Sequence, residues 1–142
     1  MSPAHQVLVV EDDPGTRTLF RAVLERRGLT VTSACDGDEA LELLAERHFD
    51  AIVLDLLMPG TDGAEVLRQL TMRSPETLQQ IVVVTAVSAV HVRRVAELDH
   101  VAAVLRKPLD ISELTAEVLG CVATSVAARN ERAASIDQRL AN

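Results

Sequence analysis

The chain of 142 residues contains no Trp or Tyr and only two Phe, so its core must be built from Val, Leu, Ile and Ala. A net charge of −7 argues against the clustered Lys and Arg of a nucleic-acid surface, and we expect no direct nucleic-acid contact. Cysteine is scarce, and Cys35 and Cys121 fit neither a CxxC motif nor a metal-ligand spacing. We therefore expect reduced thiols and a cytoplasmic location.

Longer signals are missing as well. No apolar run approaches the roughly 20 residues that span a bilayer, so we expect no membrane segment. No basic stretch followed by an apolar one marks a secretion leader at the N-terminus. Neither GxGxxG nor GxxxxGK(S/T) is present, which excludes the common nucleotide-binding loops. The four histidines (5, 48, 91 and 100) share no ligand spacing. The length fits one domain with a single core.

Short apolar runs punctuate the chain at regular intervals and predict buried strands. They lie at residues 7–10, 29–33, 51–55, 81–85 and 101–105. These runs are continuous rather than alternating with polar residues, which is typical of a parallel sheet covered on both faces. The segments between these runs carry apolar residues at helical spacing, and the pattern is less regular at residues 88–98. The pattern predicts an α/β fold with five strands and five helices.

Aspartates mark the expected helix starts. Asp13 stands before Pro14, where the missing N–H of proline leaves no hydrogen bond unmade. Three further aspartates are each followed by a glutamate three residues later, which is the capping-box spacing. These pairs are Asp36 with Glu39, Asp62 with Glu65 and Asp110 with Glu113.

Polar side chains follow four of the predicted strands at their C-terminal ends. They are Glu11 and Asp12, then Asp55, Thr85 and Lys107. Alone, each has an ordinary interpretation as a helix cap, a strand-end hydroxyl or a surface charge. Together they would meet at one edge of a parallel sheet, where open α/β sheets bind ligands. Three converging carboxylates repel unless a cation joins them, and hard oxygen ligands suit Mg²⁺. The set predicts a nucleophilic carboxylate, a metal, and two groups that stabilise a phosphoryl group in transfer.

The same segments resemble the motifs of the receiver domain of two-component response regulators. The resemblance rests on residues 7–13, 52–60, 83–86 and 107–108, and it covers roughly residues 6–122. It implies a flavodoxin-like, doubly wound sheet of five parallel strands in the order 2-1-3-4-5, flanked by five helices. It implies a receiver domain over residues 1–128, with residues 129–142 as a tail or an extension of the last helix.

The resemblance also implies a role for each site residue. Asp55 would accept a phosphoryl group from a sensor histidine kinase or a histidine phosphotransfer protein. Glu11, Asp12, Asp55 and the backbone carbonyl of Leu57 would hold Mg²⁺. Thr85, Ala86 and Lys107 would bind the phosphoryl group and switch, with Pro108 in a cis peptide bond. The protein would act on a downstream protein effector, and would not be an enzyme beyond assisting its own phosphotransfer and slow dephosphorylation.

One position departs from that pattern, and two others bear on how long a phosphoryl group would last. Val104 stands where the family usually has an aromatic residue that moves with the threonine, and a β-branched aliphatic side chain has no ring to swing. Leu57 and Val87, two residues after Asp55 and Thr85, cannot hydrogen-bond a water molecule, and together they would form an apolar lid over the phosphate. No recognisable output domain follows, so the chain resembles a stand-alone receiver.

Two other functions are compatible with parts of the pattern. A hydrolase of the haloacid dehalogenase type uses a similar set of residues, but it needs an Asp where this chain has Leu57. A degenerate receiver would be a scaffold independent of phosphate, although all five site residues are present. Residues 122, 126, 129, 133, 136 and 140 follow a heptad stripe in the tail, interrupted by Arg129, which leaves open a homodimer through the last helices or a disordered tail.

Overall fold

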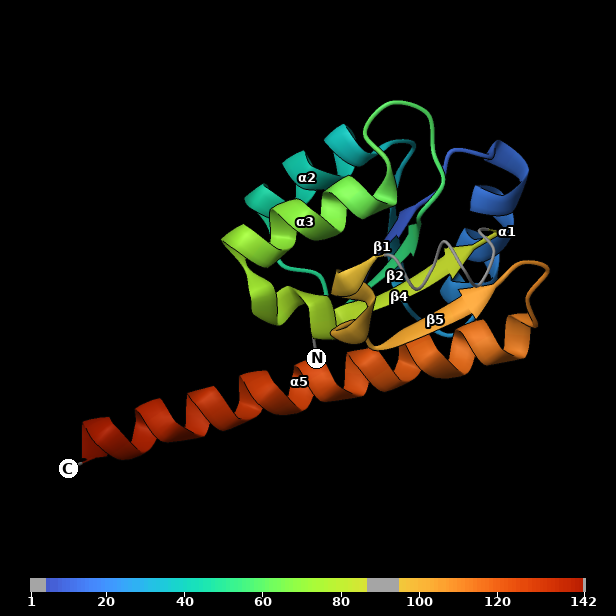
Figure 1. Ribbon diagram of the computed structural model, residues 1–142. Helices are drawn as coiled ribbons and strands as arrows, with labels where there is room; N and C mark the ends of the chain where they lie inside the picture. The colour runs from blue at the N-terminus through green and yellow to red at the C-terminus, as the bar shows by residue number, and fades with distance from the viewer. Residues whose placement is uncertain (1–4, 87–94, 142) are drawn as a thin grey trace.

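A computed structural model describes residues 5–86 and 95–141, and it shows a parallel sheet between two layers of helices (Figure 1). The strands are β1 (Gln6–Val10), β2 (Thr30–Ala34), β3 (Ala51–Asp55), β4 (Ile81–Thr85) and β5 (Ala103–Arg106). The helices are α1 (Pro14–Glu25), α2 (Gly37–Glu46), α3 (Gly63–Arg73) and α5 (Ile111–Ala141), with 3₁₀ turns η1 (Pro75–Gln80) and η2 (Ala96–Asp99). All pairings are parallel, in the order β2-β1-β3-β4-β5, which confirms the predicted topology.

Each face of the sheet carries its own apolar core. On one face, Val7, Val9 and Val53 pack with Phe20 of α1 and Leu114 of α5. On the other face, the alternate strand residues pack against α2 and α3. β3 and β4 are buried along their whole length, as continuous apolar runs require. The predicted core of aliphatic residues is confirmed, and Phe20 and Phe49 are its two buried aromatics.

Side-chain caps start the helices where the sequence places them. Asp13 accepts a hydrogen bond from the Thr16 N–H at 2.8 Å, and Asp62 accepts one from the Glu65 N–H at 3.0 Å. Asp36 caps α2 through the Glu39 N–H, but the Glu39 carboxylate turns back to the Cys35 N–H. Each cap satisfies backbone donors that the helix leaves unpaired, so the entry of each helix is locally determined.

Several boundaries differ from the sequence-based expectation. β2 and β5 begin one and two residues later than predicted, because neighbouring strands in the sheet decide where pairing starts. The 3₁₀ turn η1 was not predicted, since it has no repeating apolar pattern. Most of the helix expected at residues 88–98 lies outside the described residues, and the part that is described includes η2.

The last helix continues well past the sheet (Figure 1). α5 contains 31 residues without a break, and its first half packs on the sheet through Leu114 and Val118. By length and composition alone it is the one described helix that could cross a bilayer, contrary to expectation, but its packing on the sheet makes this weak support for a membrane span. Of the predicted stripe, Val122 and Val126 face the domain, whereas Ile136 and Leu140 are 53% and 80% exposed.

A buried aspartate ties this helix to the sheet at the end opposite the strand-end acids. Asp50 Oδ2 accepts a hydrogen bond from the Gln6 N–H at 2.9 Å. Its Oδ1 accepts one from Ser125 Oγ at 3.1 Å and pairs with the Arg129 guanidinium at 2.9 Å. His48 Nε2 lies 3.2 Å from Ser125 Oγ and 3.5 Å from Asp50, so one ring nitrogen faces both groups. This differs from a catalytic triad, in which the two groups bind opposite ring nitrogens.

We predict that Asp50→Ala lowers the free energy of unfolding by about 2–3 kcal/mol, because it leaves buried donors unpaired. Urea denaturation followed by circular dichroism measures this, since the chain has no Trp for fluorescence. Amide exchange over residues 129–141 should also quicken, because α5 loses the ion pair between Arg129 and Asp50. Asp137→Ala, on the exposed end of α5, is the control. Equal effects of the two variants would contradict a structural role for Asp50.

Candidate functional site

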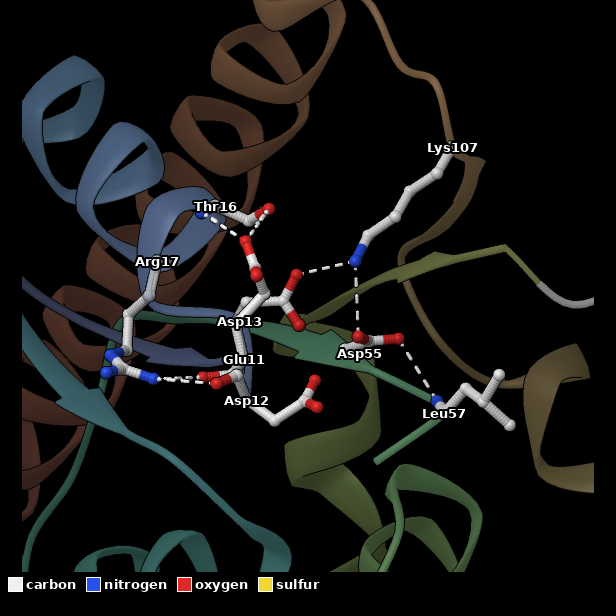
Figure 2. Close-up of polar contacts among 8 residues, drawn as sticks. All are labelled: Glu11, Asp12, Asp13, Thr16, Arg17, Asp55, Leu57 and Lys107. Atoms are coloured by element: carbon white, nitrogen blue, oxygen red, sulfur yellow. Dashed lines mark hydrogen bonds and ion pairs between the residues drawn. The ribbon is translucent and has the colours of Figure 1, made fainter. Parts of the chain in front are cut away.

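The C-terminal ends of the neighbouring strands β1 and β3 bring the predicted acidic residues together. Carboxylate oxygens of Glu11, Asp12 and Asp55 lie within 4.8 Å of one another. Glu11 and Asp55 are buried, and Asp12 is more exposed, so the cluster opens toward solvent on one side. Figure 2 shows Glu11 and Asp12 projecting from the β1–α1 loop toward Asp55.

Lys107, just after β5, completes this cluster. Its ammonium group lies 2.5 Å from Glu11 Oε1 and 3.2 Å from Asp55 Oδ2 (Figure 2). Burial alone would lower the pKa of Lys107, but its contacts with Glu11 and Asp55 raise it above the ordinary value. Lys107 is therefore charged at neutral pH, and it offsets part of the repulsion between the two acids.

Glu11 is the most perturbed acid of the cluster. Burial, followed by the neighbouring Asp55 carboxyl, raises the pKa of Glu11 to about 7, although Lys107 acts in the opposite direction. Its Oε2 is buried and has no hydrogen-bond partner among the described residues. A buried carboxylate oxygen without a partner is unfavourable, so this atom is suited to an added ligand.

The backbone around Asp55 is held by its own loop. Asp55 Oδ1 accepts a hydrogen bond from the Leu57 N–H at 3.1 Å, which fixes the turn after β3 (Figure 2). Gly63, at the start of α3, packs directly on this turn, and a Cβ there would lie 2.3 Å from the Asp55 carbonyl oxygen. Only glycine fits this approach, and the sequence pattern did not reveal it.

Thr85 and Lys107 lie at the C-terminal ends of the neighbouring strands β4 and β5. Thr85 is buried at the end of β4, and its carbonyl accepts a hydrogen bond from the Lys107 N–H at 2.9 Å. This bond sets Lys107 beside the strand end, and Ala86 follows Thr85 at the surface. Val104, at the position expected to lack an aromatic ring, pairs with Val83 in the sheet. The Lys107–Pro108 peptide bond is cis, the geometry that the resemblance implies.

The predicted apolar lid is not tested by the structure. Leu57 is 62% exposed, and its side chain points away from the Asp55 carboxylate (Figure 2). Val87 lies outside the described residues. The contribution of the pair therefore remains a prediction.

Two residues of α1 join the site that the sequence analysis did not single out. Arg17 donates hydrogen bonds to the carbonyl oxygens of Glu11 and Asp12 at 2.8 and 3.3 Å. Thr16 binds the Asp13 carboxylate through both its N–H and its hydroxyl group, and this lowers the pKa of Asp13. The positions of Thr16 and Arg17 match no sequence motif, because many side chains can hydrogen-bond to backbone carbonyl oxygens.

The donor set fits a divalent cation. Three carboxylates supply hard oxygen ligands, and Glu11 Oε2 offers an unpaired one. Mg²⁺ prefers one or two carboxylates and retains water ligands, which matches a cluster open to solvent on one side. Zn²⁺ would favour His or Cys ligands, and the described residues of this cluster include neither.

A doubly wound parallel sheet with three acids and a lysine at its strand ends defines the class of receiver proteins. A family model for the response regulator receiver domain matches residues 7–119. The chain belongs to this family.

Its relatives agree with this assignment. The chain is 46% identical to response regulator MprA of Mycobacterium ulcerans (strain Agy99) over 114 residues, covering 80% of this chain and 48% of that protein. It is 44% identical over 114 residues to MprA of Mycobacterium leprae (strain TN), covering 80% of this chain and 49% of that protein. The chain thus spans about half the length of the curated relatives it matches.

Solved structures show the same fold. The Francisella response regulator 1452 receiver domain superposes with a TM-score of 0.75 at 28% identity, covering 85% of this chain and 98% of that one. The response regulator TrrA from Thermotoga maritima, solved in complex with Mg²⁺-BeF, gives a TM-score of 0.73 at 28% identity, covering 82% and 98%.

We predict that Mg²⁺ binds about tenfold more weakly at pH 6 than at pH 8, because protonation of Glu11 removes a negative charge from the cluster. The sign follows from the raised pKa of Glu11, since the acid form accumulates as the pH falls through about 7. Titration calorimetry at both pH values measures the affinity. Glu11→Gln should bind more weakly at pH 8 and lose most of the pH dependence. An unchanged pH profile in that variant would contradict the assignment.

Proposed function

We propose that this protein is a phosphoacceptor in a two-component signalling pathway, and that Asp55 receives the phosphoryl group. The observation that supports this best is the convergence of Glu11, Asp12 and Asp55 within 4.8 Å, beside an ammonium group 3.2 Å from Asp55. A phosphohistidine on a sensor histidine kinase or a histidine phosphotransfer protein is the donor.

The transfer is an in-line displacement. An Asp55 carboxylate oxygen attacks phosphorus, a P–O bond forms, and the P–N bond to the donor imidazole breaks. The electron pair of that bond returns to the imidazole nitrogen, which takes up a proton. The product is an acyl phosphate on Asp55. Catalysis of this step depends mainly on positioning and on stabilising charge at the phosphoryl oxygens.

The chain's own residues supply those two effects. Lys107, already 3.2 Å from Asp55 Oδ2, pairs with a phosphoryl oxygen once the carboxylate is phosphorylated. The Thr85 hydroxyl and the Ala86 N–H bind the remaining oxygens at the end of β4. Glu11, Asp12, Asp55 and the Leu57 carbonyl would hold Mg²⁺, whose positive charge would offset the negative charge of the phosphoryl group. The Leu57 N–H already bonds Asp55, so the Leu57 backbone belongs to the site.

The output is a change of protein contacts. Movement of Thr85 toward the phosphoryl group alters the surface around β4 and β5, where Val104 stands in place of an aromatic ring. A downstream protein effector in the cytoplasm reads this surface, without direct nucleic-acid or membrane binding by these residues. A homodimer through the exposed end of α5 is part of this proposal, since Ile136 and Leu140 are unburied there. The chain is not otherwise an enzyme.

We predict that Asp55→Asn abolishes acyl-phosphate formation from acetyl phosphate in Mg²⁺, because an amide is not a nucleophile of this kind. Phosphate-affinity gels and sensitivity to hydroxylamine detect the modification. Asp13→Asn is the matched control, since Asp13 directly follows Asp12 in the chain but caps α1 rather than joining the cluster, and Asn caps equally well. Labelling of Asp55→Asn at the wild-type level would exclude Asp55 as the acceptor.

We also predict that the phosphorylated form is long-lived. Hydrolysis needs a water molecule held in line with phosphorus, and neither Leu57 nor Val87 can hold one. The double variant Leu57→Asn, Val87→Glu should therefore lose phosphate at least about tenfold faster in Mg²⁺ alone. Decay is measured after the phosphodonor is removed. Equal decay in the two proteins would show that these side chains do not control hydrolysis.

A further inference from the structure

Arg17 lies next to the acidic cluster without pairing with any of its carboxylates. Its Nη1 donates to the Glu11 carbonyl oxygen at 2.8 Å and to the Asp12 carbonyl oxygen at 3.3 Å. Figure 2 shows these two carbonyl groups turned toward Arg17, while the side chains of the same residues turn the other way, toward Asp55. Lys107 behaves differently, since its ammonium group contacts the carboxylates of Glu11 and Asp55 directly.

The loop between β1 and α1 needs such support. Three carboxylates with oxygens within 4.8 Å of one another repel, and this repulsion pushes the loop away from Asp55. A cation that paired with those carboxylates would relieve the repulsion but would compete with a metal for the same oxygen atoms. By binding carbonyl oxygens, Arg17 restrains the backbone and leaves the Asp12 carboxylate available.

Besides the Lys107 contact with the Glu11 side chain, the described residues make further hydrogen bonds at the two ends of the loop. The Glu11 N–H bonds the Ala34 carbonyl of β2 at 3.1 Å, and Asp13 caps α1 through Thr16. Arg17 binds between these points, at the carbonyl groups of the Glu11–Asp12 and Asp12–Asp13 peptide units. Fixing those peptide units fixes the direction in which the Asp12 side chain leaves the chain.

We propose that Arg17 is a positioning residue for the metal site: it holds the β1–α1 loop so that Glu11 and Asp12 present their carboxylates to Mg²⁺. This inference rests on the proposed function, because it assumes that the cluster binds Mg²⁺ for phosphotransfer. Groups that orient metal ligands typically contribute about tenfold or more to metal affinity.

The sign of the effect separates positioning from simple charge. A guanidinium group near a divalent cation repels it, so neutralising Arg17 would strengthen Mg²⁺ binding if charge alone mattered. Positioning gives the opposite result, since Arg17→Gln frees the loop. Arg17→Lys keeps the charge, but its side chain is one bond shorter than that of arginine. Lysine should therefore fail to restore the affinity.

The test measures Mg²⁺ affinity by titration calorimetry in wild type, Arg17→Gln, Arg17→Lys and Arg21→Gln. Arg21 is the matched control, one turn later on α1, because it donates to the Val31 carbonyl oxygen and to Glu25 but lies outside the cluster. We expect about tenfold weaker binding in both Arg17 variants and no change in Arg21→Gln. Urea denaturation of each variant checks that the fold is retained at the temperature of the titration.

Two further measurements separate positioning from a general loss of structure. Phosphorylation by acetyl phosphate should need about tenfold more Mg²⁺ for half-maximal rate in Arg17→Gln, with the rate at saturating Mg²⁺ close to wild type. Without metal, the amides of residues 12 and 13 should exchange faster in Arg17→Gln, while those in the middle of α1 remain protected. A lower saturating rate with an unchanged Mg²⁺ requirement would overturn the inference.

The outcomes also separate this inference from the function on which it rests. If wild type binds Mg²⁺ and accepts phosphate, and Arg17→Gln binds Mg²⁺ equally or more tightly, the role of Arg17 is wrong and the proposed function stands. If wild type neither binds Mg²⁺ nor accepts phosphate at Asp55, both are wrong.

Discussion

The pairing of Lys107 with Glu11 and Asp55 is the interaction on which the functional end of this molecule depends. Two buried carboxylates at neighbouring strand ends would repel strongly without it. Even with Lys107 present, burial and the neighbouring Asp55 carboxyl raise the pKa of Glu11 to about 7. The ammonium group, 2.5 Å from Glu11 Oε1 and 3.2 Å from Asp55 Oδ2, compensates part of that cost. The same contact joins β5 to β1 and β3, and so connects the last strand of the sheet to its centre.

The compensation is incomplete, as the proposed binding of a cation and a phosphoryl group requires. Glu11 Oε2 keeps no partner among the described side chains, and Asp12 remains open to solvent. A fully paired cluster would stabilise the fold but would leave no favourable place for a cation or a phosphoryl group. Buried polar groups without a hydrogen-bond partner are typical of ligand-binding sites.

A buried carboxylate also lies at the opposite end of the sheet, but there all of its charge is compensated by groups of the chain. Asp50 is as buried as Asp55, but its oxygens are occupied by a backbone N–H, a hydroxyl group and the guanidinium group of Arg129. All of these partners are permanent parts of the chain. Asp50 therefore holds α5 against the sheet, whereas Asp55, at the opposite end of β3, faces the acidic cluster. β3 is thus preceded by an acid that stabilises the fold and ends in the acid that we propose as the phosphoacceptor.

Much of the architecture followed from local patterns in the sequence. Continuous aliphatic runs and aspartate caps predicted the five strands, the helix starts and the sheet class, because burial on both faces and orphan N–H groups are local requirements. The convergence of Glu11, Asp12, Asp55 and Lys107 was predictable for the same reason, since parallel strands end at one edge. The family resemblance supplied the strand order and the individual roles.

Tertiary structure alone decided the contacts that have no periodicity. Arg17 reaches two carbonyl oxygens across a turn, Gly63 is required by its approach to the Asp55 backbone, and Asp50 meets Arg129 from a distant helix. Each depends on the direction of a side chain or on the distance between segments that are remote in sequence. The sequence therefore determined which residues gather at the strand ends, and the folded chain determined how they are held there, because hydrogen bonds to backbone atoms can be made by many side chains and leave no pattern to read.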